Sequence, residues 1–189
     1  MPELTAYRLR EVLDYDAMTG IFSWKVSTTF RVKVGQVAGG SDGHGYLRIA
    51  IDGRKHLSHR LAWLYQTGAW PRRHIDHING TKTDNRFANL REATRSQNMS
   101  NRGKLATNTS GFKGVTRRHD EKRWRAQIKV HGKIRNLGRF NTPEEAHAAY
   151  GVAAKKYHGE FSNVGSGCEL SSAVGIAEDI RALLSESKS

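Results

Sequence analysis

The feature that most constrains the fold of this chain is a 25-residue stretch, residues 74–98, that holds no cysteine. It contains the pair Asp76-His77, a later Asn-Leu-Arg and the start of a helix. Neighbouring side chains of a strand point to opposite sides, so Asp76 and His77, at the end of a short strand with apolar flanks, would face different surroundings. One could hold a cation while the other activates water. This is the layout of a small metal-dependent phosphodiester cleavage site.

A helix is predicted to begin at Thr94, because Thr94 and Gln97 have the spacing of a capping box. Asn98 then lies about one turn into the helix, pointing back at the strand end. The polar pairs Asn79-Gly80 and Asp84-Asn85 lie between the strand and the helix. Such pairs are ordinary turn formers, and we assign both to turns.

The stretch resembles the ββα-metal core of HNH nucleases, specifically the group found in phage homing endonucleases. Asp76-His77, Asn89 with its following Leu-Arg, and Asn98 carry the resemblance at these separations. It implies that Asp76 and Asn98 bind one divalent ion, that His77 is the general base and that Asn89 orients the His77 ring. Such oxygen ligands suit Mg²⁺ or Mn²⁺ rather than zinc. The ion would polarise the phosphate and stabilise the leaving 3′ oxygen, while neutral His77 takes the proton from water.

Two departures from the family pattern are visible. Asn98 stands where the family's name promises a second histidine, a substitution common in the phage group, so a variant site is expected. Many HNH proteins carry two Cys-x-x-Cys pairs around the site, whereas this chain has a single cysteine, Cys168. No structural zinc is therefore expected.

The formal net charge of +13 is unevenly distributed along the chain. The balance is zero over residues 1–53, +8 over 54–110, +7 over 111–164 and −2 beyond. A basic central region between neutral ends indicates a polyanion partner. The alternative, a soluble basic protein without such a partner, is disfavoured because the positive charge is concentrated in one region. No stretch approaches the roughly 18 apolar residues that cross a bilayer, so no membrane partner is expected. The first residues lack the core of a secretory signal, and one cysteine permits no internal disulfide. We therefore expect the reducing cytoplasm of a phage-infected bacterial cell.

The resemblance implies an HNH endonuclease domain at residues 1–100. The polar composition that follows predicts a linker at 101–110, a second domain at 111–165 and a tail with a weak helix at 166–189. The linker is polar and without periodicity. In it, Arg102 and Lys104 could reach DNA phosphates.

Several elements are predicted upstream of the nuclease core. A helix candidate precedes a short strand at 21–24, and Asp52-Gly53 suits a type I′ turn between strands at 46–51 and 54–57. Ser58 is expected to cap a helix that ends near Gly68. These elements would form the wall against which the metal site packs. His59 and Arg60 could touch DNA, but a structural role is equally open.

Three strands are predicted in the second domain, at 113–118, 123–130 and 133–140. In the middle strand apolar and polar residues alternate, so the two faces differ. One face carries Trp124, Ala126, Ile128 and Val130, and the other carries Arg123, Arg125, Gln127 and Lys129. A helix follows, with Thr142 as N-cap, a proline and acidic residues in its first turn. Its mostly alanine stripe would lie close on the apolar face, leaving the opposite face free and cationic.

Residues 112–164 resemble the DNA-binding domain of the plant Apetala/ethylene-response-factor type, in the form fused to phage HNH nucleases. Gly114-Val115, Trp124 and the segments 137–140 and 145–150 carry this resemblance. It implies that the sheet enters the major groove, a known mode for β-sheet readers. The residues it would turn toward DNA are Lys113, Arg118, Arg125, Gln127, Lys129 and Arg139. Thr116 and Asn136 depart from the family's frequent arginine and tryptophan, so no base preference is predicted.

The chain is thus expected to have an α+β fold. A ββα-metal HNH nuclease core with an N-terminal hairpin and helix lead-in would precede a three-stranded antiparallel sheet packed on one helix. The predicted function is that of a homing-type, metal-dependent endonuclease that binds double-stranded DNA. A monomer is expected, which favours nicking, whereas a dimer would cut both strands. One alternative is a non-catalytic DNA-binding regulator on an HNH scaffold. Another is an RNA-binding protein, which the lack of paired exposed aromatics on one sheet face disfavours.

Overall fold

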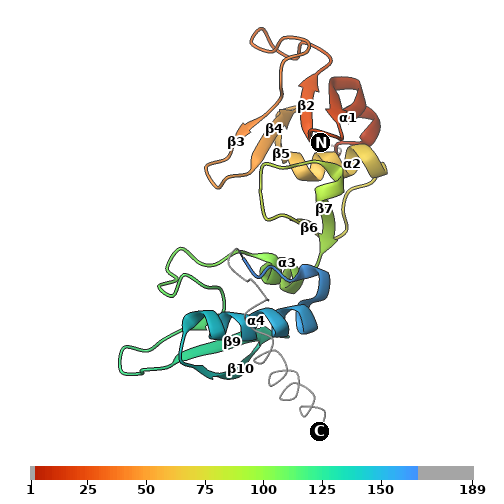
Figure 1. Cartoon of the computed structure of the whole chain (residues 1–189). Helices are drawn as coiled ribbons and strands as arrows, with labels where there is room; N and C mark the ends of the chain where they lie inside the picture. Colours follow the sequence, from red (N-terminus) through yellow and green to blue (C-terminus); the bar gives the residue numbers. More distant parts are fainter. Residues whose placement is uncertain (1–2, 166–189) are drawn as a thin grey trace. The chain divides into compact units, whose positions relative to one another are not determined.

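The computed structural model of the chain describes residues 3–165, which fall into two units (Figure 1). The division lies between Asn98 and Met99, inside helix α3 (Arg95–Asn101), whereas the sequence placed it after residue 100. The physical reason is that the last turn of α3 is bonded to the C-terminal unit. Lys113 Nζ donates to the Ser100 carbonyl at 2.6 Å, and Asn163 Nδ2 donates to the Asn101 carbonyl at 2.9 Å. The tail helix expected within 166–189 lies outside the described residues.

The N-terminal unit consists of short helices and strands. Helix α1 begins after Thr5, whose hydroxyl accepts from the Arg8 amide at 3.1 Å. The strands pair antiparallel, as β1 with β2, as β3-β4-β5, and as β6 with β7. The elements are α1 (Ala6–Val12), β1 (Leu13–Asp16), β2 (Ile21–Trp24), β3 (Gly40–Ser41), β4 (Leu47–Ile51), β5 (Arg54–Leu57), α2 (Ser58–Thr67), β6 (His74–His77), the 3₁₀ turn η1 (Phe87–Asn89) and β7 (Leu90–Ala93).

Most of the turns and helix ends that local sequence predicts in this unit are present in the structure. Asp52 and Gly53 have φ values of 48° and 78°, the two positive angles that a type I′ turn requires, so the predicted hairpin is confirmed. Gly68 ends α2 in the left-handed conformation, as expected. The expected Ser58 cap is wrong. The N-cap is Leu57, because α2 follows β5 without an intervening turn, and the Ser58 hydroxyl is buried without a hydrogen-bond partner among residues 3–165.

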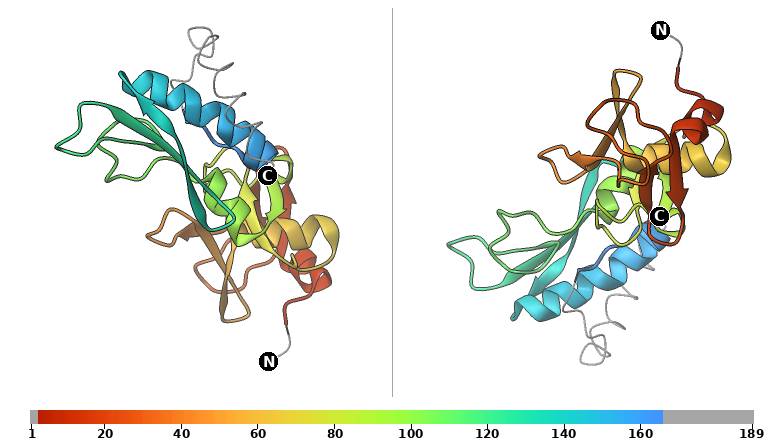
Figure 2. Two further views of the ribbon diagram at one scale, coloured as in Figure 1. Left: turned by 90° about the horizontal axis from the view of Figure 1, so that it is seen from below. Right: turned by 90° about the horizontal axis from the view of Figure 1, so that it is seen from above.

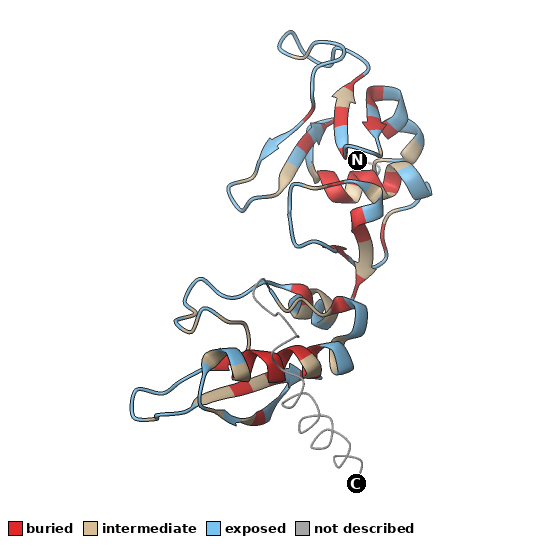
Figure 3. Cartoon of the chain, in the orientation of Figure 1, coloured by how far each residue is buried: buried red, intermediate tan, exposed pale blue. Residues whose placement is uncertain are grey.

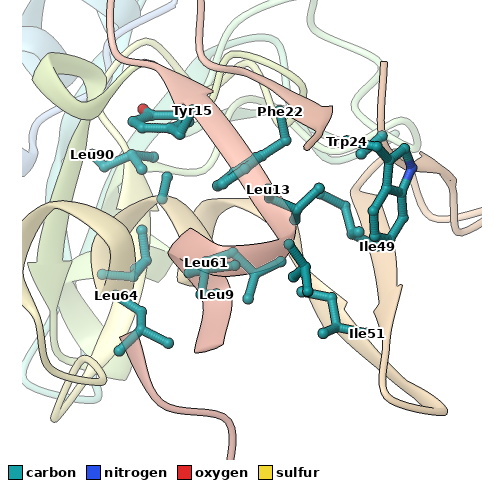
Figure 4. Packing of buried hydrophobic residues seen from close by; sticks show 14 residues of the cluster. Leu9, Leu13, Tyr15, Phe22, Trp24, Ile49, Ile51, Leu61, Leu64 and Leu90 are labelled. Carbon is teal, nitrogen blue, oxygen red and sulfur yellow. The ribbon is translucent and has the colours of Figure 1, made fainter. Parts of the chain in front are cut away.

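One hydrophobic core holds these short elements together. Figure 4 shows Leu9, Leu13 and Phe22 packed with Leu61 and other aliphatic residues of α2 and β4. The same core includes Ile75 of β6 and Leu90 of β7. The hairpin that carries Asp76 and His77 is therefore packed on the lead-in elements.

The C-terminal unit is a three-stranded antiparallel sheet with one helix along it. The sheet order is β10-β9-β8, and both views of Figure 2 show α4 running beside the strands. The N-cap of α4 is Thr142, which forms the predicted capping box with Glu145. The elements are β8 (Val115–Thr116), β9 (Trp124–Val130), β10 (Lys133–Phe140), α4 (Pro143–His158) and the 3₁₀ turn η2 (Gly159–Phe161).

Small residues allow α4 to approach the sheet closely. Its alanines are buried against Ala126 and Ile128 of β9, which confirms the predicted alternation in that strand, and Figure 3 shows this buried side of the helix. Gly114 has φ +75°, and a Cβ there would lie 2.0 Å from the Tyr150 ring. Only glycine fits that backbone conformation and that space.

Candidate active site and cationic sheet face

The candidate active site lies on the hairpin of β6 and β7. Asp76 pairs with Arg91 and His77 with Leu90 across the two strands. Asp76 and His77 are buried, with 3% and 6% of their surfaces exposed. Such burial is unusual for an Asp-His pair and calls for specific partners.

Helix α3 follows β7 after one residue, Thr94. The Gln97 amide donates to Thr94 Oγ1 at 3.2 Å, and the Thr94 amide donates to Gln97 Oε1 at 2.8 Å, so the predicted capping box is confirmed. The amide of Asn98 donates to the Thr94 carbonyl, which places this half-buried residue in the first turn of the helix. Two strands and a helix thus follow one another in the predicted order. Three of the four predicted site residues belong to the hairpin or its loop, and Asn98 belongs to the helix that follows.

His77 is held by a polar contact and by aromatic rings. Its Nε2 lies 3.2 Å from Asn85 Oδ1, and its ring meets that of His59 edge to face, with centroids 5.1 Å apart. Burial lowers the pKa of His77, and the Asn85 contact offsets part of that effect. His77 is therefore neutral near pH 7, the form a general base needs. If Nε2 donates to Asn85, Nδ1 is the basic nitrogen.

The side chain of Asn89, which we expected to orient the His77 ring, is hydrogen-bonded within the loop between the two strands. Its Nδ2 donates to Asn79 Oδ1 at 3.0 Å and to the Asp84 carbonyl at 2.9 Å, and its Oδ1 accepts from the Asn79 amide at 3.0 Å. The turn η1 directs this side chain back into the loop between the strands. Asn89 therefore closes the loop, while Asn85, which we assigned to a turn, contacts His77.

The position of Asn85 depends on residues far away in the sequence. The Tyr15 hydroxyl donates to the Asn85 carbonyl at 2.7 Å. Gly20 has φ +74°, and a Cβ there would lie 2.4 Å from the Arg86 nitrogen. The β1–β2 hairpin therefore packs directly against the backbone of Asn85 and Arg86. The sequence offers no signal for this contact, because Asp-Asn is also an ordinary turn pair.

Asp76 is oriented by a salt bridge across the hairpin. Arg91 Nε donates to Asp76 Oδ2 at 2.9 Å, and the terminal nitrogen Nη2 lies 2.9 Å from the same oxygen as part of the ion pair. Both side chains are largely shielded from water, with 14% of Arg91 and 4% of Asp76 exposed. A charge-assisted pair of this kind fixes the direction of the carboxylate.

His59 belongs to the same cluster and does not face outward. It is 5% exposed, and burial, followed by the effects of His77 and Arg60, lowers its pKa to about 3. Its ring lies 5.4 Å from that of Tyr46, over which the Lys82 ammonium lies at 4.7 Å. Of the two open roles for His59, the structure favours the structural one.

A second candidate surface is the outer face of the C-terminal sheet, called here the cationic face and defined by Arg125, Gln127, Lys129 and Arg139. Lys129 and Arg139 are exposed, and the other two are half-buried. Arg125 and Arg139 lie directly opposite each other on β9 and β10. Glu121 Oε1 lies 2.9 Å from Arg125 and 3.5 Å from Arg139 and separates these like charges.

The remaining predicted DNA contacts lie outside that face. Arg118 is exposed and lies 3.5 Å from Asp120. Arg102 and Lys104 are exposed in the loop after α3, where Lys104 Nζ donates to the Gly111 carbonyl at 3.1 Å. All three side chains remain accessible to a partner.

Lys113 is a correction, because it turns into the C-terminal unit. Its Nζ donates to the carbonyls of Ser100 and Asn163, at 2.6 and 2.9 Å, and burial lowers its pKa to about 8. Lys113 precedes β8 and lies beside α4, with Nζ 5.8 Å from the centre of the Tyr150 ring. Its ammonium ties segments of the unit together, so we remove it from the set of DNA contacts.

Comparison with known proteins supports the nuclease assignment. Residues 56–100 match the family model described as HNH endonuclease. The chain is 29% identical over 110 residues to protein 3.8 of Escherichia phage T7, a match that covers 58% of this chain and 88% of that protein. It is 33% identical over 89 residues to an uncharacterized HNH endonuclease of Acanthamoeba polyphaga mimivirus, covering 47% of this chain and 45% of the relative. The chain therefore carries an HNH endonuclease domain and is a nuclease.

The chain also has short matches of a different kind. An ethylene-responsive transcription factor of Arabidopsis thaliana is 50% identical over 52 residues, which cover 26% of this chain and 12% of that protein. The chain thus spans most of the phage protein but only a small part of the plant factor. No solved structure matches the chain. In the part of the chain that the structure describes, no helix is long and apolar enough to cross a membrane.

Proposed function

We propose that this nuclease is a metal-dependent DNA endonuclease of the homing type. In this proposal the N-terminal unit cleaves the phosphodiester bond, and the C-terminal sheet makes most of the contacts with DNA. The observation that carries the proposal is a buried, neutral His77 next to a buried Asp76, inside the segment that matches HNH endonucleases. Kinship with a phage protein supports the phage-infected bacterial cell as its place of action.

Asp76 and Asn98 are the residues that would hold the cation. HNH nucleases generally use a divalent metal, and a carboxylate with a carboxamide fits Mg²⁺ or Mn²⁺. The Asp76 carboxylate is also fixed in place by Arg91, as a metal ligand should be. When bound, the ion polarises the scissile phosphate and stabilises the leaving 3′ oxygen.

His77 would take the proton from the attacking water. Burial keeps the imidazole neutral, and the Asn85 carboxamide holds the ring through Nε2. His59 and Tyr46 line the ring and limit its rotation. A fixed, neutral base saves the cost of orienting the imidazole during the reaction.

The cationic face would bind the duplex, with help from Arg118, Arg102 and Lys104. Its cations project from adjacent strands on the side away from α4, as β-sheet readers of the major groove require. The plant-factor matches, which are transcription factors by name, support this assignment.

The decisive experiment is incubation of the full chain with supercoiled plasmid in Mg²⁺ or Mn²⁺. We expect open-circular DNA if one site acts alone and linear DNA if two copies cut together. Excess EDTA should stop the reaction, and restored Mg²⁺ should restart it. Protein that binds the plasmid but leaves it supercoiled under every metal condition would refute the proposal.

A further inference from the structure

The loop formed by residues 25–37, between β2 and β3, is the most exposed apolar part of the N-terminal unit. Figure 1 shows it extending away from β2, and Figure 3 shows it almost wholly exposed. Phe30 has 89% of its surface exposed, more than the other exposed large hydrophobic residues. Val34 and Val37, at 66% and 63%, add to the patch. An apolar group of this kind on an otherwise polar surface indicates a binding function.

The loop is also cationic. It carries Lys25, Arg31 and Lys33, and no aspartate or glutamate occurs from residue 17 to residue 41. The Arg31 guanidinium lies 5.0 Å from the centre of the Phe30 ring. Positive charge around an exposed aromatic ring is complementary to a nucleic acid, which offers phosphates beside flat bases.

The loop is held in shape by its own hydrogen bonds. Its base is joined to β2, since the Trp24 amide donates to the Gln36 carbonyl at 2.9 Å and the Gly35 amide donates to the Trp24 carbonyl at 2.7 Å. Near the tip, Ser27 Oγ donates to the Val32 carbonyl at 2.7 Å. A loop already ordered loses little entropy when it binds.

We propose that loop 25–37 is a second DNA-binding element and that Phe30 inserts as a wedge between neighbouring base pairs. Arg31 and Lys33 would contact the flanking phosphates. Apolar wedges that partly unstack a base step are an established way for proteins to bend duplex DNA. The inference rests on the proposed function, because it takes duplex DNA as the partner of the same unit that carries the nuclease site.

The test measures unstacking and binding separately. The full chain, in EDTA to prevent cleavage, is added to random-sequence duplexes in which 2-aminopurine replaces some adenines. We expect the fluorescence of 2-aminopurine to rise with wild-type protein. Phe30→Ala should abolish the rise and lower affinity by roughly tenfold, and Phe30→Leu should keep part of both, since leucine also serves as a wedge. Met18→Ala is the matched control, because Met18 is 82% exposed elsewhere in the same unit.

Three measurements separate the possible outcomes: binding of a labelled duplex, sedimentation of the protein alone, and binding to anionic lipid vesicles. Arg31→Ala and Lys33→Ala should each flatten the log–log salt dependence by about one unit. Duplex binding without a fluorescence rise, or with an equal rise in Phe30→Ala, would overturn the wedge and leave the nuclease proposal standing. Absence of any duplex binding would overturn both. A Phe30-dependent change in sedimentation of the protein alone, or in binding to anionic lipid vesicles, with unchanged unstacking, would assign the loop to another partner.

Discussion

The two units of this protein use polar residues in opposite ways. In the N-terminal unit, Asp76, His77, Asn85 and Asn89 are buried, and each contacts a specific polar side chain or backbone group. In the C-terminal unit, a simple sheet and helix bury alanines and aliphatic side chains and leave the arginines and lysines of one sheet face accessible. Burying polar groups costs desolvation free energy but fixes the geometry of their side chains. Leaving charged side chains exposed costs little free energy and gives the sheet a positive surface.

Under the proposed function, this difference would place chemistry in the N-terminal unit and DNA binding in the C-terminal unit. Buried polar groups are retained where orientation matters, because each needs a partner in a definite direction. Surface cations bind a polyanion through counterion release and need no single geometry. Substitutions in the two units should therefore affect different measurements, cleavage rate in one and affinity in the other.

The largest effect is expected at His77, the proposed general base. His77→Ala should lower the single-turnover nicking rate by ~10²–10⁴ while duplex affinity stays nearly unchanged, because the base acts only when water attacks. His74→Ala, an exposed histidine on the same strand, is the matched control and should retain activity. A wild-type nicking rate in His77→Ala would show that His77 is not the general base and would contradict the assignment of cleavage to the N-terminal unit.

Comparing Asn85 with Asn89 sharpens the description of the buried cluster. Asn85→Ala should lower the cleavage rate by roughly tenfold, the effect of losing one hydrogen bond to the base. Asn89→Ala should instead lower the melting temperature, because it removes three hydrogen bonds that close the loop. The two variants are compared by single-turnover kinetics and thermal unfolding. The reverse pattern would assign the orientation of His77 to Asn89 instead of Asn85.

Removing positive charge from the cationic face tests whether the C-terminal unit provides DNA affinity. The double variant Lys129→Ala, Arg139→Ala should weaken duplex binding and reduce the log–log salt slope by about two units, roughly one for each lost phosphate contact. Lys155→Ala, an exposed cation of α4, should leave the slope unchanged. Equal losses in both variants would mean that net charge, and not the cationic face, determines affinity.

The smallest effect is a pH dependence of stability in the C-terminal unit. Burial lowers the pKa of folded Lys113 from 10.5 to about 8, so between these values the unfolded chain binds a proton that the folded chain does not. Stability should therefore rise as pH increases through this window and be insensitive to Lys113 below it. We expect a gain on the order of a few degrees in melting temperature from pH 8 to 10 relative to Lys113→Met. An identical pH profile in both proteins would show that the ammonium is not desolvated.

Most local structure could be predicted from the sequence. Capping boxes at Thr94 and Thr142, the Asp52-Gly53 turn and the alternation of β9 depend on residues close together in the chain, where backbone geometry dictates which atoms meet. The placement of Asp76 and His77 on one short strand follows from the same local rules.

Tertiary structure decided which polar residues meet. Asn85 contacts His77 because Tyr15 and Gly20, far upstream, hold its backbone, and His59 joins the cluster because α2 packs beside the hairpin. Lys113 turns inward because the carbonyls of Ser100 and Asn163 converge on it. In each case the deciding contact joins residues distant in sequence. Local sequence therefore determined the elements and the cationic face, whereas burial and long-range hydrogen bonds determined the environment of His77.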